Sequence, residues 1–505
     1  SVTLSHMKDV RPDNYNGVVW YRRSFSLETV QNQDWWLCFD AVDYKAEVWL
    51  NGYFLGSHEG GYTGFDYCLS TLPEGVLASG DNELVVRVID QDWNNGLTDD
   101  DIHIKETLAG FVQDTRKLNY SGIWQNVYLE ARGTVLSQDV FVQTLDIASG
   151  AVQAEMTLVN AQAQPRTVTV KAAVKDGPSA ENTYTVPACG TLPVTMQMTI
   201  ANPHLWTAND PYRYTLTVTV TDGDSVDSLS QKFGMRTVGV EGTKVLVNGE
   251  AVFLTGMLHW GSYYDNYTPA VSMEQVRREI TALKEDGFNA IKYCLLSPPD
   301  YVLELCDELG MYVYIEYPIW NVTESAAFFE RAYLQMMEMV VKDRRFAGVI
   351  MTDFNCEDLE FSQEMDQLMK WCVETSKDVA PNRLYTDNSS NGEHRYGDFA
   401  TCHPYYQVNC YEDMLNGWIQ KRGDQPLILG EFADISVLRD LTALKEKESP
   451  DYSWYHDYYQ DYDQAAIMRE FGYSEEEITR IIGQSVLNAQ ELRKYYIEAS
   501  KKNNH

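Results

Sequence analysis

The hydrophobic periodicity of the chain changes near residue 250, and this change limits the possible folds more than any other feature of the sequence. Before it, apolar and polar residues alternate, as in RTVTVKAAV (166–174), with the period of two that marks strands. After it, short apolar runs alternate with segments of helical period, such as 273–286, where Val276 and Ile280 fall on one face. The sequence therefore predicts a β-rich part followed by repeated βα units.

The β-rich part has two textures, which predict two domains. Residues 1–133 contain many short strands with frequent turn signals, among them Asn51-Gly52, whose residue types favour the positive φ angles of a two-residue hairpin turn. That pattern predicts a jelly roll. Residues 134–238 hold longer period-two strands rich in Thr and Val, and a segment of about 100 residues with such strands is typical of an immunoglobulin-like β-sandwich.

Residues 239–505 predict an α/β domain, because repeated βα units build a parallel sheet and this many in succession close into a TIM (β/α)8 barrel. The last predicted helix, 474–500, is followed by no further strand candidate. We therefore expect the barrel to lack its eighth strand in this chain. The strands that the pattern predicts are 252–258, 289–293, 311–317, 348–352, 383–386, 398–402 and 427–430.

Charge and cysteine usage narrow the partners and the compartment. The net charge of −34 argues against nucleic acid and anionic membranes as partners, because both carry negative phosphate groups. No apolar run reaches the length of about 18 residues that a membrane-spanning helix needs. Nine cysteines without CxxC spacing favour a reducing compartment and hence a cytoplasmic protein. The chain begins at Ser1 without an initiator Met, so a periplasmic or secreted protein with a removed leader is the alternative.

Catalysis in a TIM barrel takes place at the carboxyl ends of the strands, so the polar residues there are the candidates. Glu357 and Glu431 each follow a buried β run, in GVIMTDFNCE and PLILGE. The aromatic residues Trp320 and Tyr405 lie in strand-end loops, where a platform for sugar rings explains them better than core packing does. The complete set of polar strand-end candidates is His259, Lys292, Glu316, Glu357, Asp387, His403 and Glu431.

Two carboxylates that face one pocket from different strands fit glycoside hydrolysis. One protonates the leaving oxygen, and the other attacks the anomeric carbon when the two are about 5 Å apart, whereas a wider gap admits water and inverts the configuration. The same positions also fit a structural interpretation. In that interpretation Glu316 and Asp387 are salt-bridge partners, and His259 and His403 are histidines with satisfied hydrogen bonds in the core.

Three long segments resemble glycoside hydrolase family 2, the group of the β-galactosidases, β-glucuronidases and β-mannosidases. FDAVDYKAEVWLNGYFLGSHEGGYTGFDYCLS (39–70) is similar to the jelly-roll hairpin region of that family, and SGIWQNVYLE (121–130) is similar to the closing strand of that domain. FGMRTVGVEGTKVLVNGEAVFLTGMLHW (233–260) looks like the join from the sandwich domain into the barrel. Because the resemblance covers nearly the whole chain in the right order, it is specific.

The resemblance also implies roles for the strand-end residues. TDFNCE (352–357) stands where the family has a motif like W-S-x-x-N-E, which implies that Glu357 is the acid/base, and GEFAD matches the nucleophile motif at Glu431. His259 and Tyr405 match a histidine after the first strand and a tyrosine that borders the nucleophile. The implied activity is that of a retaining exo-β-glycosidase, which acts on a carbohydrate by double displacement and requires no cofactor or metal. A homo-oligomer is expected.

Departures from the family pattern leave a second function open. Cys356 stands where the family has the asparagine that hydrogen-bonds the sugar 2-hydroxyl, and a thiol is a weaker donor. Thr352 replaces a tryptophan, and KYCLLSP, which begins at Lys292, replaces a pattern like R-x-S-H-Y-P. The sugar site is therefore expected to be rebuilt. A catalytically impaired glycan-binding relative is the alternative to an active enzyme of the β-galactosidase or β-glucuronidase type.

Overall fold

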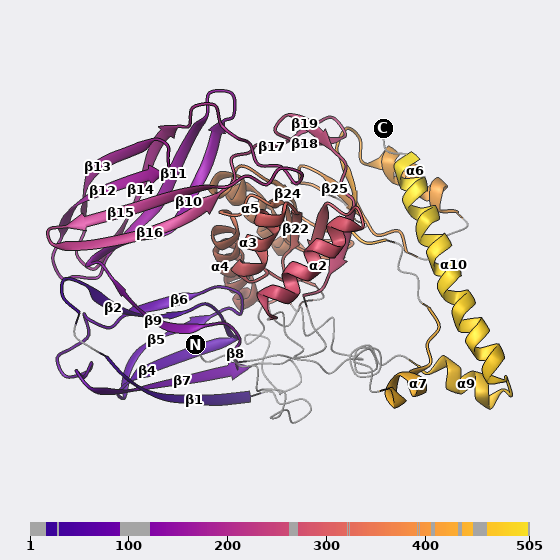
Figure 1. Cartoon of the computed structure of the whole chain (residues 1–505), viewed down its shortest axis with the longest axis horizontal. Coiled ribbons are helices and arrows are strands. Elements are labelled where there is room, and N and C mark those ends of the chain that lie inside the picture. The colour runs from indigo at the N-terminus through magenta and orange to yellow at the C-terminus, as the bar shows by residue number, and fades with distance from the viewer. Residues whose placement is uncertain are drawn as a thin grey trace.

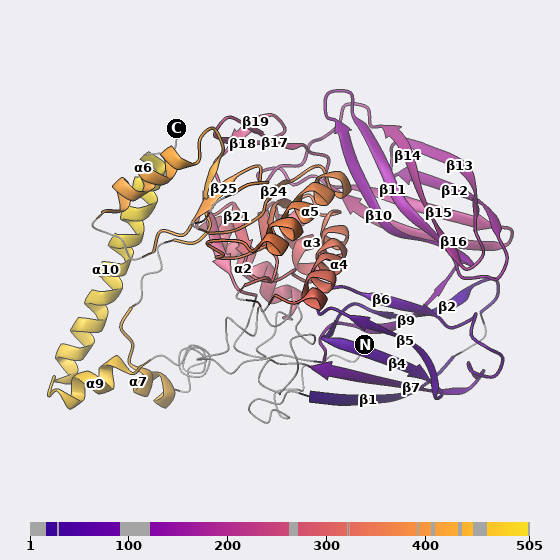
Figure 2. The same ribbon diagram turned by 180° about the vertical axis from the view of Figure 1, so that it is seen from behind.

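The computed structural model describes residues 17–27, 30–90, 122–261, 271–320, 322, 324–390, 392, 394–405, 410–432, 437–447 and 462–502. Two β regions lie on one side of an α/β region, and a long helix, α10, lies along the opposite side (Figure 1). The view from behind shows the same order (Figure 2). This arrangement agrees with the predicted order of two β domains and a barrel domain. The division of the chain at residues 133 and 238 stays a prediction.

The first β region contains two packed sheets, with strand orders β1-β7-β4-β5 and β6-β2-β9, and a short antiparallel pair, β3-β8. Leu37, Val48 and Val86 belong to the core between the two sheets. The predicted hairpin turn is confirmed, because Asn51 and Gly52 have φ angles of 49° and 81° and join β4 to β5. The strands are β1 (Gly17–Ser26), β2 (Asp34–Phe39), β3 (Val42–Asp43), β4 (Lys45–Leu50), β5 (Tyr53–Glu59), β6 (Phe65–Cys68), β7 (Asp81–Asp90), β8 (Gly122–Ile123) and β9 (Val127–Arg132).

The second β region is a sandwich of sheets with orders β10-β11-β14 and β13-β12-β15-β16. In β11 every second residue from Val152 to Leu158 is buried, as the period-two pattern predicts, and these side chains join one apolar core. The strands are β10 (Val135–Asp146), β11 (Ala151–Asn160), β12 (Arg166–Val174), β13 (Ser179–Val186), β14 (Gly190–Thr199), β15 (Tyr214–Asp222) and β16 (Ser225–Phe233).

All seven strands that the βα pattern predicts are present and pair in parallel. Five form one sheet in the order β20-β21-β22-β23-β24, and β25 pairs with β26. After β26, the described part of the chain contains helices and no eighth parallel strand. The strands are β20 (Gly256–His259), β21 (Ala290–Tyr293), β22 (Tyr312–Glu316), β23 (Val349–Asp353), β24 (Leu384–Thr386), β25 (Ala400–Cys402) and β26 (Leu427–Leu429).

The first barrel strand begins at Gly256 and not at residue 252, so that predicted boundary is wrong. The cause is a turn at Asn248 and Gly249, whose φ angles of 55° and 79° reverse the chain. As a result β19 (Glu250–Val252) pairs with β18 (Lys244–Val247), which pairs with β17 (Val238–Glu241), in a separate antiparallel sheet.

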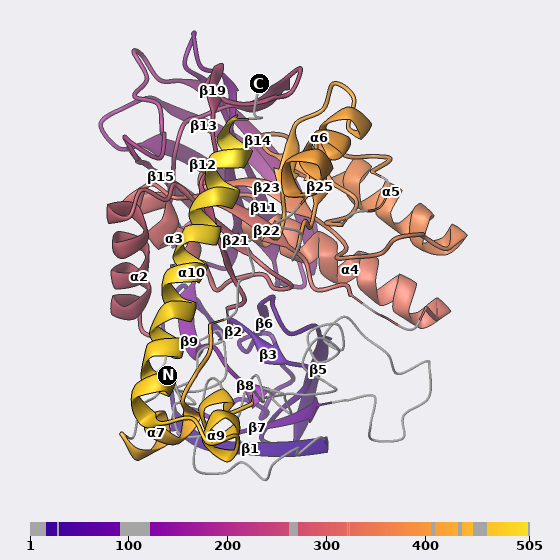
Figure 3. The same ribbon diagram turned by 90° about the vertical axis from the view of Figure 1, so that its right-hand side faces the viewer.

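Helices pack around the parallel sheet, and α4 and α5 run side by side (Figure 3). Ser272, Ser325 and Ser362 begin α2, α4 and α5, because each hydroxyl accepts a hydrogen bond from a backbone N–H of the first turn. None of the helices in the described residues is long and apolar enough to cross a membrane. The helices are α2 (Met273–Glu285), α3 (Asp300–Leu309), α4 (Ala326–Asp343), α5 (Gln363–Val379), α6 (Tyr411–Lys421), α7 (Leu441–Glu446), α9 (Gln464–Glu470) and α10 (Glu475–Lys502).

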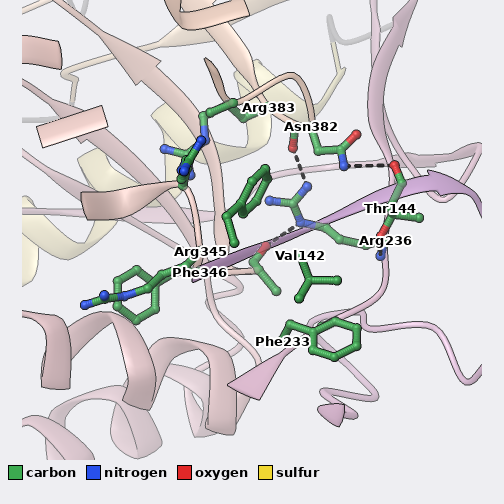
Figure 4. A pocket seen from close by; sticks show the side chains of 13 residues that line it. Val142, Thr144, Phe233, Arg236, Arg345, Phe346, Asn382 and Arg383 are labelled. Carbon is green, nitrogen blue, oxygen red and sulfur yellow. Dashed lines mark hydrogen bonds between the residues drawn. The ribbon is translucent and has the colours of Figure 1, made fainter. Parts of the chain in front are cut away.

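Arg236 ties the second β region to the barrel. Figure 4 shows its guanidinium group beside the backbone of Asn382, whose carbonyl oxygen accepts one of its hydrogen bonds. The other guanidinium N–H groups donate to the carbonyl oxygens of Ala347 and Val349, the latter at 2.8 Å. The cavity beside these groups has a volume of about 20 Å³. That volume has room for about one water molecule, so the cavity is too small for a sugar.

Helix α4 carries the contact between the first β region and the barrel. The side-chain amide of Gln335 donates to the Tyr44 hydroxyl at 2.5 Å, and the Thr63 hydroxyl donates to Glu338 at 2.8 Å. Trp124 of the first β region is part of the apolar core of the barrel. One side of α4 is therefore covered by the first β region, and another side packs on the sheet.

Candidate active site

The carboxyl ends of the parallel strands bring six polar side chains into one cluster. Each lies at the end of a short strand or in the loop after it, so the sheet fixes the position of its backbone. Five of the six are predicted candidates, and the sixth is a serine after β24. The members are Lys292 on β21, Glu316 on β22, Glu357 after β23, Ser389 after β24, His403 after β25 and Glu431 after β26.

Backbone hydrogen bonds hold the loop between β23 and α5 on both of its sides. The Cys356 N–H donates to the carbonyl oxygen of Ile319 at 2.9 Å, and the Glu357 N–H donates to that of Ser389 at 3.0 Å. Glu357 has a φ angle of 60°, in the left-handed region that residues other than glycine rarely adopt. Such backbone outliers concentrate at functional sites, where the surrounding structure holds them in place.

Lys292 and Glu316 form a buried ion pair beneath the other members of the cluster. The Lys292 ammonium also donates to the Ser389 hydroxyl at 2.9 Å, and the Cys294 thiol donates to Glu316 Oε1 at 2.9 Å. Burial acts to raise the pKa of Glu316, but Lys292 and the thiol outweigh it and hold that pKa below its usual value. The pair is therefore ionised although it is buried.

Glu431 lies beside this pair. Its Oε1 atom is 3.9 Å from Lys292 Nζ and 3.8 Å from the Cys294 Sγ atom. Burial raises the pKa of the Glu431 carboxyl, and the neighbouring Lys292 opposes that shift. The preceding Gly430 lies so close to the ring of His403 that an added Cβ would stand 2.8 Å from Nε2. A larger residue at 430 would therefore displace the His403 ring.

Glu357 occupies the more open side of the cluster. Its Oε1 atom is 2.9 Å from Nδ1 of His403, and Nε2 of that ring is 3.1 Å from the Ser389 hydroxyl. The His403 side chain is buried, whereas the Glu357 side chain is 36% exposed. Carboxylate oxygens of Glu357 and Glu431 lie within 4.8 Å of each other. Two carboxyl groups at this separation have room for one sugar carbon between them.

The same side chains form two groups of atoms of the types that bind metal ions. One group is Cys294, Glu316 and Glu431, and the other is Glu357, His403 and Glu431. In the first group the Lys292 ammonium already supplies a positive charge next to both carboxylates. That charge disfavours a cation in the first group.

Two predicted site residues have contacts outside this cluster. Nε2 of His259 is 3.9 Å from Glu279 of α2, and its Nδ1 atom accepts a hydrogen bond from the Gly261 N–H. Asp387 is buried and accepts hydrogen bonds from the Arg395 N–H and the Thr386 hydroxyl. These contacts match the structural interpretation of Asp387 more closely than a contact with substrate.

An apolar patch lies next to the ion pair. Cys294, Leu295 and Cys356 are buried together, and Trp260 and Trp320 pack against them. The Tyr405 ring meets the His403 ring edge-on, with 6.1 Å between the ring centres. Cys356 and the predicted aromatic residues Trp320 and Tyr405 therefore lie next to residues that contact the carboxylates. Burial, followed by the nearby charge of Glu316, raises the pKa of the Cys356 thiol, which stays protonated.

Ser389 and Cys294 are members of the site that the strand-end pattern does not pick out. Cys294 is two residues beyond Lys292, and that spacing places it on the same face of the strand, so the period of two could have found it. Ser389 lies in the run DNSS (387–390), which carries no motif. A parallel bridge to Cys356 brings Ser389 to the cluster.

Comparison with known families and proteins places this geometry in a wider context. Three family models match the chain in sequence: the sugar binding domain of glycosyl hydrolases family 2 at residues 3–132, the family 2 model at 135–236, and the family 2 TIM barrel domain at 238–465.

Curated relatives and solved structures agree with these matches. The β-galactosidase of Thermoanaerobacter pseudethanolicus is 24% identical over 384 residues, which are 73% of this chain and 50% of the relative. The β-galactosidase of Psychromonas ingrahamii is 25% identical over 68% of this chain and 33% of the relative. The chain thus spans about a third to a half of these relatives. A putative β-galactosidase from Bacteroides fragilis has the same fold, with a TM-score of 0.73 and 20% identity over 88% of this chain and 70% of that one. The chain belongs to glycosyl hydrolases family 2.

Proposed function

We propose that the chain hydrolyses a terminal β-linked sugar of a carbohydrate with retention of configuration, with Glu431 as nucleophile and Glu357 as acid/base. One observation carries the proposal: carboxylate oxygens of the two residues lie within 4.8 Å of each other, close to the separation of about 5 Å in retaining glycosidases. The relatives support the substrate class, since they are β-galactosidases and a putative β-glucuronidase. Activity of this chain by itself is part of the proposal.

In the first step, an electron pair of the Glu431 carboxylate forms a bond to the anomeric carbon. The bond from that carbon to the leaving oxygen breaks, and Glu357 gives its proton to this oxygen. Lys292, at 3.9 Å from Glu431, favours the anionic form that attack requires. The product of the step is a glycosyl ester on Glu431 and a released alcohol.

In the second step, a water molecule replaces the alcohol. The Glu357 carboxylate takes a proton from this water. At the same time the water oxygen forms a bond to the anomeric carbon, and the ester bond to Glu431 breaks. Both side chains return to their starting protonation states, and two inversions give net retention. His403, which is 2.9 Å from Glu357, holds this carboxyl in place for both proton transfers.

The test uses purified protein and the 4-nitrophenyl β-glycosides of galactose, glucuronic acid, galacturonic acid and mannose. We expect hydrolysis of at least one, with the β anomer appearing first in proton NMR spectra. In the Glu431→Gln variant we expect the rate to fall by about 10⁴-fold or more. Full activity in this variant, or the α anomer as first product, would contradict the assignment.

The alternative function is a glycan-binding relative that has lost turnover. The observation that favours it is Cys356, a buried thiol packed against Cys294 at a position expected to hold a hydrogen-bonding amide. Calorimetric titration with the four free sugars separates the two functions. Binding without hydrolysis of any of the four aryl glycosides would select the alternative.

A further inference from the structure

A groove runs over the outer surface of the barrel between α4 and α5, which lie side by side (Figure 3). Its volume is about 920 Å³, within the range of about 300–1,000 Å³ for small-molecule sites. The site described above does not include it. Three aromatic rings, two leucines and several polar side chains from the first halves of both helices line it.

The aromatic part of this α4–α5 groove includes Trp371 and Tyr333, whose rings contact each other. Trp371 is 54% exposed, and its ring meets the ring of Tyr333 edge-on at 6.3 Å between centres. The Tyr333 hydroxyl lies 3.2 Å from the Thr375 hydroxyl, which bridges the two helices. An exposed indole face supported in this way presents a flat apolar surface, and such surfaces stack on the C–H faces of sugar rings.

Polar side chains that can form hydrogen bonds with sugar hydroxyls also line the groove, together with Trp371. Gln363, Gln367 and Trp371 are spaced by four residues on α5, so they share one face of the helix. Glu364 on α5 and Glu330 on α4 are exposed in the same groove. Amides both donate and accept hydrogen bonds, and carboxylates accept them, which suits the hydroxyl groups of a sugar.

The negative charge of the groove favours neutral carbohydrates over acidic ones. Three carboxylates line the groove, on Glu330, Glu364 and Asp366, and none of the described residues of the lining is Lys or Arg. Asp366 is engaged by Arg395 at 2.6 Å and by the Tyr396 hydroxyl at 2.8 Å, which leaves the two glutamates to set the local charge. Acidic sugar chains would be repelled from this surface, whereas neutral ones would not.

The position of the groove relates it to the leaving-group side of the proposed reaction. Helices of a barrel begin at the end where the preceding strands stop, and that end carries Glu357. Gln363, the first residue of α5, follows Glu357 by only six positions in the chain. Because Glu357 is the proposed acid/base, the part of the substrate that leaves lies on its side of the pocket.

We propose that the α4–α5 groove binds the leaving-group end of a neutral oligosaccharide, with Trp371 stacked on a sugar ring. This inference rests on the proposed function for its link to catalysis, but its binding step does not require turnover. The groove is then a second carbohydrate site, which favours neutral oligosaccharides over aryl glycosides and over uronic acid chains as substrates.

The test measures tryptophan fluorescence while β-1,4-linked galactotetraose, mannotetraose or cellotetraose is added to the full chain in its Glu431→Gln form, with tetragalacturonate as the acidic probe. We expect at least one neutral tetrasaccharide to bind and tetragalacturonate not to bind. Trp371→Ala should weaken the binding about five- to tenfold, as expected for loss of one stacked ring. The matched control is Trp20→Ala, since Trp20 is 60% exposed on β1 in the first β region.

Kinetics of the otherwise wild-type chain give the second measurement. Trp371→Ala should lower kcat/KM for the bound tetrasaccharide by the same factor and leave kcat/KM for an aryl glycoside unchanged. Failure of every neutral probe to bind, preference for tetragalacturonate, or equal effects of Trp371→Ala and Trp20→Ala would overturn the inference. Absence of any hydrolysis alongside Trp371-dependent binding would overturn the proposed function and leave the groove as a carbohydrate site.

Discussion

The two carboxylates of the site differ in how firmly the protein holds them. The Glu431 side chain is only 10% exposed and lies 3.9 Å from Lys292, which itself pairs with buried Glu316. The Glu357 side chain is 36% exposed and has a histidine as its neighbour. The difference suits the two roles proposed for them, because a nucleophile has to stay ionised and in place, whereas an acid/base has to exchange protons with sugar and water.

The largest expected effect comes from exchanging each carboxylate for alanine in the presence of azide. We expect Glu431→Ala and Glu357→Ala each to lower the hydrolysis of alkyl glycosides by about 10²-fold or more, with the greater loss for Glu431. Azide should rescue both on an aryl glycoside but give different products. It replaces the nucleophile in the first variant and yields the α-glycosyl azide, and it attacks the glycosyl ester in the second and yields the β-azide. If NMR spectra of the products showed the same azide anomer from both variants, Glu431 and Glu357 would not have the two different roles proposed for them.

Lys292→Met tests whether the positive charge of Lys292 keeps Glu431 ionised. Burial raises the pKa of Glu431 and Lys292 lowers it, so loss of the lysine raises that pKa further. Since the anion is the reactive form, the acid limb of the pH–rate profile should move to higher pH. The free energy of unfolding should fall by about 3–5 kcal/mol, because Glu316 is left unpaired and buried.

The matched control for Lys292→Met is the double variant with Glu316→Gln. Removing the unpaired charge should restore most of the stability, as measured by urea unfolding, but not the position of the acid limb. If the double variant recovers the wild-type pH profile as well, Lys292 acts through folding alone.

His403→Phe tests how Glu357, the more exposed of the two carboxylates, is held in place. The ring of His403 lies between Glu357 and Ser389, so its loss should misplace the acid/base without touching the nucleophile. We expect kcat/KM to fall about tenfold for a methyl β-glycoside, whose leaving oxygen needs a proton. For the 2,4-dinitrophenyl β-glycoside, which leaves without one, the change should stay within about threefold. Equal losses on both substrates would show that the histidine supports the fold and not proton transfer.

Cys294→Ser should have the smallest effect. The thiol donates to Glu316 at 2.9 Å, and a serine hydroxyl at the same place can donate the same hydrogen bond. We expect kcat/KM on an aryl glycoside to stay within about threefold of the wild-type value. A loss of tenfold or more would show that the sulfur itself, at 3.8 Å from Glu431, takes part in holding the nucleophile.

The sequence predicted the strands of the barrel well because each is a short buried run between helical segments. It placed the start of the first one wrongly, because the Asn248-Gly249 turn that redirects the chain lies inside an apolar stretch. Convergence of Glu357 with Glu431 was predictable for a general reason: parallel strands all end at one face of a barrel.

The contacts within the site were less predictable, because they depend on distances between strands remote in sequence. Lys292 and Glu316 were both candidates, yet nothing local indicates that they pair. Asp387 and His403 each directly follow a strand, and these two strands, β24 and β25, are consecutive in the chain. Asp387 nevertheless bonds to its own loop at Arg395, and only His403 reaches Glu357.

Arg236 has a consequence for how such chains can be cut and recombined. It belongs to the connection between β16 and β17, outside the barrel strands, yet its hydrogen bonds end on backbone carbonyl oxygens next to β23 and β24. A gene fragment that starts at codon 239 would encode a barrel without this arginine. Buried carbonyl groups at Ala347, Val349 and Asn382 would then lose their donor. A chimeric protein that joins this barrel to a different β domain therefore has to include Arg236.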